Sequence, residues 1–166
     1  MTQSQPIPVF TLYGETAVFP DVVHCERFSA RAPIHDWRIA AHRHSHMAQV
    51  FLIEEGQVAA QVDGQDLSLG DGTFLFVPAQ AAHEFVFRPD TGGLVVSVPQ
   101  SVVRTIGPAQ QDILAALLQP LHGAASPRLQ NLLAMLDDIA GPAHPFRDQM
   151  AVGLVHAALA EVAAGA

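Results

Sequence analysis

The sequence predicts a mainly β protein, in which a small barrel of short strands is followed by about three α-helices. The chain has 166 residues, a hydrophobic fraction of 49% and a mean hydropathy of +0.24, which suit one globular domain with a proper core. Up to about residue 105, runs rich in Val, Phe, Leu and Ile are separated by Gly, Pro and Asp, as in all-β proteins. Beyond that point leucine and alanine recur at helical spacing. We therefore expect a barrel at 1–104 and a helical segment at 105–166.

Strands are expected throughout the barrel, at about 9–13, 22–28, 37–41, 48–54, 57–62, 65–69, 73–77, 83–87 and 94–98. Asp63-Gly64 is a strong hairpin signal, because both positions of a two-residue turn of this type favour positive φ. Closing this turn sets three pairs, Val62 with Gln65, Ala60 with Leu67 and Val58 with Leu69. The apolar residues then share one face, which supports this register.

Three helices are expected after the barrel. The first carries one apolar stripe, formed by Ile113, Leu114, Leu117, Leu118 and Leu121. The second has Ser126 as its cap and Pro127 at its first helical position, and it ends before Gly141. The third covers about residues 145–164. Three apolar helical faces exceed what one small barrel needs, so we expect part of this surface to contact a partner.

Composition excludes several classes of function. A net charge of −8 argues against binding of DNA or RNA by the surface of these residues. The chain has no lysine, which excludes Schiff-base chemistry. A single cysteine, Cys25, excludes an internal disulfide and suits the cytoplasm. We expect no membrane association, because no apolar run approaches about 18 residues and no secretory signal is visible.

Three histidines are the main candidates for a functional site. His42 and His44 are two apart, so on a strand they face the same side, and His83 can join them from a later strand. Three imidazoles inside a barrel can hold a metal or an acidic ligand. Hydrogen-bonded core histidines are the alternative interpretation, and a catalytic acid–base role is a third.

The rest of the expected site follows from strand parity. Gln49 has the opposite parity to His42 and His44, so it joins them only through a bend between residues 45 and 48. The inward face then continues through Phe51 and Phe85. Together these residues suit a small aromatic or polar-aromatic ligand.

A cation for a ligand carboxylate is expected at the rim of the barrel. Arg38 shares the parity of His42 if the strand is regular, which would turn it inward. It precedes His42 by four residues, about 13 Å along a strand, so it can serve only from the rim. Placement on the surface is equally compatible with the sequence, and Arg27, Arg43 or a histidine cation are alternatives.

These residues resemble the two-motif signature of the cupin family. The first motif is present as His42, His44 and Gly56, and the second as Gly72, Pro78 and His83. Three positions depart from the pattern: Gln49 stands for a glutamate, Gln80 for a glycine and Phe87 for an asparagine. The resemblance implies a double-stranded β-helix (jelly-roll barrel). It also implies a metal site at His42, His44, His83 and Gln49, although the only carboxylate ligand of the pattern is missing.

Further segments resemble the N-terminal effector domains of AraC-type transcriptional regulators, in the branch that responds to hydroxybenzoates. The segments that carry this resemblance are residues 7–15, 23–27 and 35–39, followed by the two motifs. In that family a cupin-like sensor precedes a helical dimerisation segment and a DNA reader. No DNA reader follows in this chain, so we expect a shortened form of a regulator or a stand-alone sensor.

The resemblance implies a sensor that binds a small effector, an aromatic carboxylate. Strand parity and residue chemistry give its expected contacts, which are Arg38, His42, His44, Gln49, Phe51, His83 and Phe85. No cofactor is required, and a divalent ion (Zn, Ni, Fe or Mn) is compatible with the site. The expected partners are the effector and a second copy of the chain, with DNA bound only through an absent domain. The alternatives are a metal-dependent cupin dioxygenase or isomerase that uses His42, His44 and His83, and a binding module without a signalling role.

Overall fold

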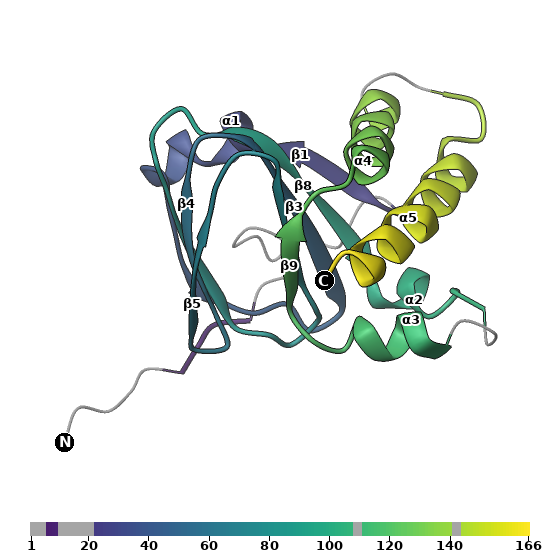
Figure 1. Ribbon diagram of the computed structural model, residues 1–166, viewed down its shortest axis with the longest axis horizontal. Coiled ribbons are helices and arrows are strands. Elements are labelled where there is room, and N and C mark those ends of the chain that lie inside the picture. The colour runs from purple at the N-terminus through teal and green to yellow at the C-terminus, as the bar shows by residue number, and fades with distance from the viewer. Residues whose placement is uncertain (1–5, 10–21, 108–110, 141–143) are drawn as a thin grey trace.

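The computed structural model describes residues 6–9, 22–107, 111–140 and 144–166. Two antiparallel sheets face each other, and helices cover the outer side of one of them (Figure 1). The described elements are β1 (His24–Arg27), α1 (Phe28–Arg31), η1 (Pro33–His35), β2 (Arg38–His42), β3 (Met47–Glu55), β4 (Val58–Val62), β5 (Gln65–Leu69), β6 (Thr73–Val77), β7 (His83–Phe87), β8 (Gly92–Pro99), α2 (Gln100–Val103), α3 (Gln111–Ala116), β9 (Leu121–Ala124), α4 (Pro127–Ala140) and α5 (Arg147–Ala164).

The strand orders are β1-β8-β3-β6-β9 in the five-stranded sheet and β2-β7-β4-β5 in the four-stranded sheet. The expected barrel with helices after it is confirmed, and two of these helices, α4 and α5, are long. The strand expected at about 9–13 lies outside the described residues apart from Val9, which forms an isolated bridge with Arg43. The other expected strands are present, with ends that differ by a few residues.

The hairpin between β4 and β5 has the expected turn and register. Asp63 and Gly64 have φ angles of 47° and 81°, the positive values that this turn requires. Val62 pairs with Gln65, Ala60 with Leu67 and Val58 with Leu69. The even positions of β4 are buried and the odd ones exposed, so the apolar face of the hairpin lines the barrel.

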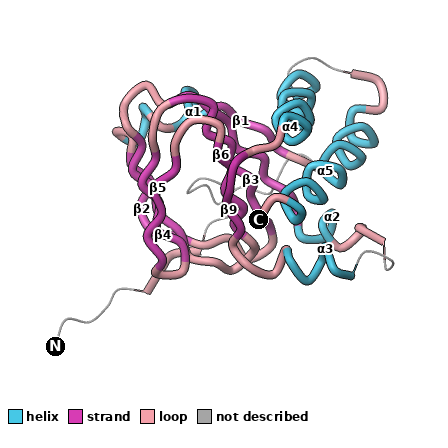
Figure 2. The backbone as a smooth tube through the Cα atoms, viewed as in Figure 1, coloured by secondary structure: helices cyan, strands magenta, loops and turns pink. Residues whose placement is uncertain are grey.

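Strand β3 lies between two hydrophobic clusters. Phe51 and Ile53 belong to the cluster inside the barrel, between the two sheets. Val50 and Leu52, of opposite parity, belong to the cluster on the outer side, together with buried residues of α4 and α5. Figure 2 shows this arrangement, with the long helices beside the five-stranded sheet and away from β4 and β5. The helices therefore pack on the reverse side of a strand that lines the barrel.

The segment after residue 105 is not wholly helical, and this corrects the sequence-based expectation. Leu121 was expected in the stripe of the first helix, but α3 ends at Ala116 and Leu121 begins β9. β9 pairs antiparallel with β6, with Leu121 opposite Phe76, and completes the five-stranded sheet. Helical spacing of leucines is a local signal, and here it is overridden by the hydrogen bonds that the open edge of β6 offers.

The starts of α4 and of α5 follow from local chemistry. Ser126 accepts a hydrogen bond from the backbone N–H of Leu129 at 3.0 Å, which confirms its predicted role as the cap of α4. Buried leucines one turn apart on α4 and small residues of α5 bring the two helices together. Arg147, the first residue of α5, donates to the carbonyl oxygen of Ile139 at 3.0 Å and so links the two helices.

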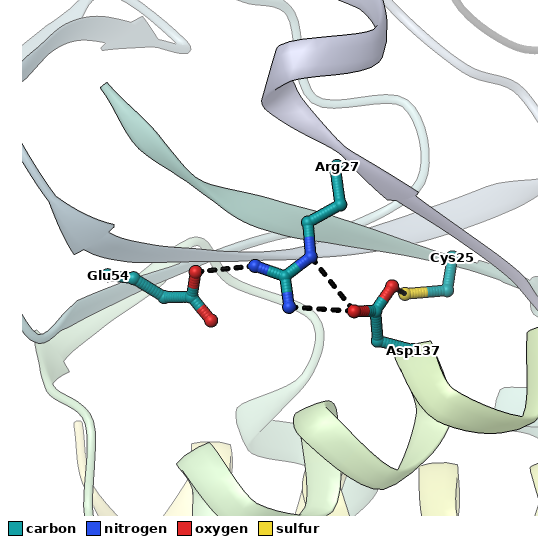
Figure 3. A network of polar contacts seen from close by, with 4 residues as sticks. All are labelled: Cys25, Arg27, Glu54 and Asp137. Carbon is teal, nitrogen blue, oxygen red and sulfur yellow. Dashed lines mark hydrogen bonds and ion pairs between the residues drawn. The ribbon is translucent and has the colours of Figure 1, made fainter. Parts of the chain in front are cut away.

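An ion-pair network ties α4 to the barrel (Figure 3). The Arg27 side chain, on β1, contacts Glu54 of β3 through Nη1 at 2.6 Å and Asp137 of α4 through Nη2 at 2.7 Å. Cys25 lies on the same side of β1, with its Sγ 3.9 Å from Oδ1 of Asp137. Helix α4 is thus attached by a polar contact as well as by the apolar cluster. None of the described helices is long and apolar enough to cross a membrane.

Candidate metal and ligand site

His42, His44 and His83 converge inside the barrel, as the sequence predicted; together they are the three-histidine cluster. His42 ends β2 and pairs directly with His83, the first residue of β7, while His44 follows in the connection to β3. One ring nitrogen from each histidine lies within 4.8 Å of the others. All three side chains are buried. Within the described ranges this is the one group of three or more potential ligand side chains that meets at such distances.

Backbone carbonyls orient two of the three rings. Nδ1 of His42 donates to the carbonyl oxygen of Ala40 at 2.8 Å, and Nδ1 of His83 donates to that of Ala81 at 2.9 Å. This arrangement fixes the tautomer and leaves Nε2 as the lone-pair nitrogen that a metal ion uses. Nε2 of His83 is buried and has no hydrogen-bond partner among the described residues. A divalent ion at the three-histidine cluster would satisfy this atom, so the residues fit a metal.

Burial also keeps the imidazoles of His42 and His83 neutral at pH 7. Burial lowers the pKa of His42 from its ordinary value of 6.5. The pKa of His83 is lowered further, to about 3, by burial first and by the neighbouring His42 and His44 next. Neutral imidazole is the form that binds a metal ion. His42 and His83 are therefore in the protonation state that binds a cation at neutral pH.

Gln49 lies on the inner face of β3, at the end of the barrel that holds the three-histidine cluster. It pairs with Val77, the last residue of β6, and the connection that follows Val77 leads to His83 at the start of β7. The Gln49 side chain is 1% exposed and donates from Nε2 to Oγ of Ser97 on β8, at 3.0 Å. Its Oε1 is buried without a hydrogen-bond partner among the described residues.

Ser97 is a polar residue of the interior that the sequence-based prediction missed. It is fully buried, at 0% exposed, and it faces Gln49 in the cross-strand register. The signal in the sequence is a single serine within the apolar run 94–98, where a buried hydroxyl requires a partner. Ser97 holds Gln49 on the inner face and so places the unpartnered Oε1 beside the interior.

Aromatic rings occupy the interior beyond the histidines. The Phe85 ring centroid lies 5.6 Å from that of His83 and 4.7 Å from that of Phe51. Phe87 continues the row along β7, and its ring centroid is 5.1 Å from that of Phe28 of α1. The predicted inward placement of Phe51 and Phe85 is confirmed by their burial. The barrel interior is thus lined by imidazoles at one end and by phenyl rings at the other.

Arg38 does not face inward, and the parity argument that placed it there is wrong. It pairs with Val86, which is 42% exposed, and Arg38 is itself exposed. The register between β2 and β7 shifts between Ile39 and His42. This irregularity reverses the parity of the strand, so the face that carries His42 at one end carries Ile39, not Arg38, at the other.

Gln80, which stands where the family pattern has glycine, keeps the backbone conformation of a glycine and makes two hydrogen bonds of its own. Its φ angle is +74°, in the left-handed region that favours glycine, at the position where the pattern has glycine. Its backbone N–H donates to the carbonyl oxygen of His44 at 2.7 Å, and its side chain donates to that of Ser45 at 3.2 Å. These bonds hold the segments before His83 and after His42 against each other.

Comparison with known proteins identifies a cupin domain at residues 31–99. The chain is 34% identical over 74 residues to quercetin 2,3-dioxygenase of Bacillus subtilis strain 168, covering 42% of this chain and 22% of that protein. The chain thus spans about a fifth of the length of this curated relative.

Solved structures to which the chain is similar in part include a transcriptional activator and a protein of Vibrio cholerae. The AraC-like transcriptional activator CuxR is 15% identical with a TM-score of 0.46, over 70% of this chain and 43% of that one. ToxT from Vibrio cholerae is 10% identical with a TM-score of 0.48, over 86% of this chain and 56% of that one.

Proposed function

Starting from the cupin domain that the chain contains, we propose that the protein is the ligand-sensing and dimerisation region of an AraC-type transcriptional regulator and not an enzyme. The observation that carries the proposal is the double role of β3. Gln49 and Phe51 face the barrel interior, while Val50 and Leu52, between and beside them, share a buried cluster with α4 and α5. A ligand that moves β3 from inside the barrel therefore also moves side chains that pack directly against α4 and α5.

Strand β8 supports the same coupling. Val95 and Ser97 face the interior, and Val96 and Val98 face the helices. Packed interfaces of this kind shift between discrete arrangements and do not deform continuously, so ligand contact on the inner face can change how the helices sit outside. The effect requires only that the ligand binds one arrangement better than the other.

The proposed effector is a small aromatic carboxylate that is bound without being converted. The phenyl rings of Phe51 and Phe85 suit an aromatic ring, and the three-histidine cluster and Gln49 suit its polar groups. The proposed homodimer uses the helical segment, where Met135 on α4 and Met150 on α5 are 55% and 40% exposed. The missing carboxylate ligand at Gln49 supports sensing over catalysis.

Thermal unfolding and hydrogen exchange test the proposal together. The protein is screened against hydroxybenzoates, phenylacetates and unrelated acids, with and without added Zn²⁺. An effector should raise the melting temperature and change the protection of amides in α4 and α5, and chromatography should recover it unaltered. If a ligand binds and the amide protection of α4 and α5 does not change, the result would favour a binding module without a signalling role. Failure of every aromatic acid in both conditions would remove this class of effector.

A metal-dependent cupin enzyme, a dioxygenase or isomerase, is the second candidate. Two observations favour it: three ligand nitrogens lie within 4.8 Å of one another, and part of the chain is similar to quercetin 2,3-dioxygenase. Metal-loaded protein is incubated with quercetin and with hydroxybenzoates while oxygen uptake and products are followed. Turnover that depends on metal and disappears in His83→Ala would favour the enzyme over the sensor.

A further inference from the structure

Two side chains of the barrel interior, His83 and Gln49, each present a buried acceptor atom that has no hydrogen-bond partner among the described residues. The buried polar side chains of the described residues are His42, His44, Gln49, His83, Thr91 and Ser97. Nδ1 of His83 is used as a donor to Ala81, so its unpartnered Nε2 presents a lone pair. Gln49 donates to Ser97, so its unpartnered atom is the acceptor Oε1. A ligand that meets these two atoms must bring donors or positive charge.

The arginines closest to the interior are engaged or turned away. All eight arginines of the chain lie in the described ranges. Arg27 is bound to Glu54 and Asp137 on the outer side of β1, and Arg31 donates to Glu26 at 2.9 Å. Arg38 is exposed on the outer face of β2. Arg43 lies between His42 and His44, so the alternation of side chains places it on the opposite face from these two histidines, and its Nε is buried without a hydrogen-bond partner among the described residues.

The other four arginines lie farther along the chain and outside the barrel. They are Arg88 after β7, Arg104 after α2, Arg128 on α4 and Arg147 on α5. The described interior therefore holds no arginine side chain. A carboxylate that entered it would lose its hydration and meet lone pairs instead of a counter-charge, which strongly disfavours binding.

We infer that a carboxylate effector is held in the barrel by a divalent metal ion on the three-histidine cluster and not by an arginine, so that acid and metal bind with positive linkage. The inference rests on the proposed function, because it specifies how the proposed acid is recognised. A divalent ion satisfies the lone pair of His83 and adds positive charge where the protein itself offers only lone pairs. The metal thereby decides whether the interior accepts anions.

Calorimetry on the full chain tests this linkage in the wild-type protein. Binding of 4-hydroxybenzoate is measured after EDTA treatment and after saturation with Zn²⁺, and 4-hydroxybenzamide, which is neutral and similar in shape, is measured beside it. The acid should bind tenfold or more tightly with Zn²⁺, within the roughly 5- to 150-fold range of typical couplings. The amide should show much less dependence on the metal. By reciprocity the acid should tighten Zn²⁺ binding by the same factor.

Three variants identify the group that receives the carboxylate. Arg38→Gln and Arg43→Gln should bind the acid as the wild type does, because neither side chain faces the interior. His83→Ala should lose the effect of Zn²⁺ on acid binding. Because the cavity left by His83→Ala can destabilise the fold, the comparison of EDTA-treated and Zn²⁺-loaded wild type is decisive without it.

The outcomes separate the inference from the proposed function. Equal affinity for the acid with and without Zn²⁺, or loss of acid binding in Arg38→Gln or Arg43→Gln, overturns the metal-mediated recognition while the sensor proposal stands. Absence of acid binding in both conditions, with Zn²⁺ bound, overturns the acid as effector and the inference with it. Metal-dependent binding of the acid but not of the amide supports both.

Discussion

Arg27 and Asp137 form a two-point ion pair in which Nε and Nη2 of the guanidinium both donate to Oδ2, at 2.9 and 2.7 Å. The pair connects an edge strand of the five-stranded sheet to helix α4 (Figure 3). Glu54 holds the same guanidinium from β3, the strand that also lines the barrel. The attachment of the helices therefore has a defined polar contact, and its removal is a direct test of how firmly the helices are held.

Arg27→Gln is expected to lower the free energy of unfolding by about 1 kcal/mol. This value is at the upper end of the range for exposed ion pairs, because one guanidinium binds two carboxylates. Urea unfolding at low salt measures the loss, which should shrink at high salt. Arg128→Gln is the matched control, since Arg128 is 81% exposed and its ion pair is with Glu161. An equal loss in the control would mean that the network has no special role.

Zn²⁺ or Ni²⁺ should stabilise the protein through the three-histidine cluster. At a hundredfold excess over the dissociation constant the gain is about 2.7 kcal/mol, seen as a rise in melting temperature. His44→Ala should abolish this rise, because His44 contributes one of the three nitrogens. His46→Ala should retain it, since His46 is exposed and lies outside the cluster. A similar rise in both variants would place the metal elsewhere.

Acid should destabilise the metal-free protein through His83. The pKa of His83 is about 3 in the folded state and 6.5 ordinarily. Between these two pH values the imidazole is protonated in the unfolded chain and neutral in the folded chain. The stability from neutral His83 is complete above pH 6.5 and is lost as the pH falls toward 3, by about 1.4 kcal/mol per pH unit for a single group. Urea unfolding between pH 7 and pH 4 should show this slope, and His83→Gln should flatten it.

Two glycine substitutions should have opposite effects. Gly93 has a φ of +155°, and a Cβ there would lie 2.1 Å from the carbonyl oxygen of Leu52 and 2.6 Å from the ring of Phe28. Gly93→Ala should therefore cost about 3 kcal/mol or more, as overpacking does in a core. Gly153 lies on α5, and an added Cβ there would meet nothing within 4 Å, so Gly153→Ala should gain about 0.5–1 kcal/mol. Thermal unfolding of both variants measures the difference.

The Cys25 thiol should react slowly with iodoacetamide. Burial first, and the neighbouring Asp137 next, raise its pKa to about 12, so little thiolate is present at pH 8. Asp137→Asn removes the nearby negative charge and should speed alkylation, followed by mass spectrometry. Rapid alkylation of the folded wild type would contradict this account.

The sequence by itself determined the features that depend on local chemistry and on the alternation of side chains. Asp63-Gly64 dictates the turn and hence the register of β4 with β5, because few residues adopt two successive positive φ angles. Ser126 marks the start of α4, because its hydroxyl satisfies a backbone N–H that the helix leaves open. The spacing of His42 and His44 already places both imidazoles on one side.

Only the tertiary structure decided the features that depend on which strands and helices meet. The irregular pairing of β2 with β7 turns Arg38 outward, since one shift of register exchanges the two faces of a strand. Leu121 pairs with the edge of β6 as part of β9, although its spacing from the preceding leucines is helical. Ser97 meets Gln49, and Arg27 meets Asp137, across 48 and 110 residues of sequence. Such contacts leave no local periodicity in the chain, because each partner is chosen by the packing of the whole fold.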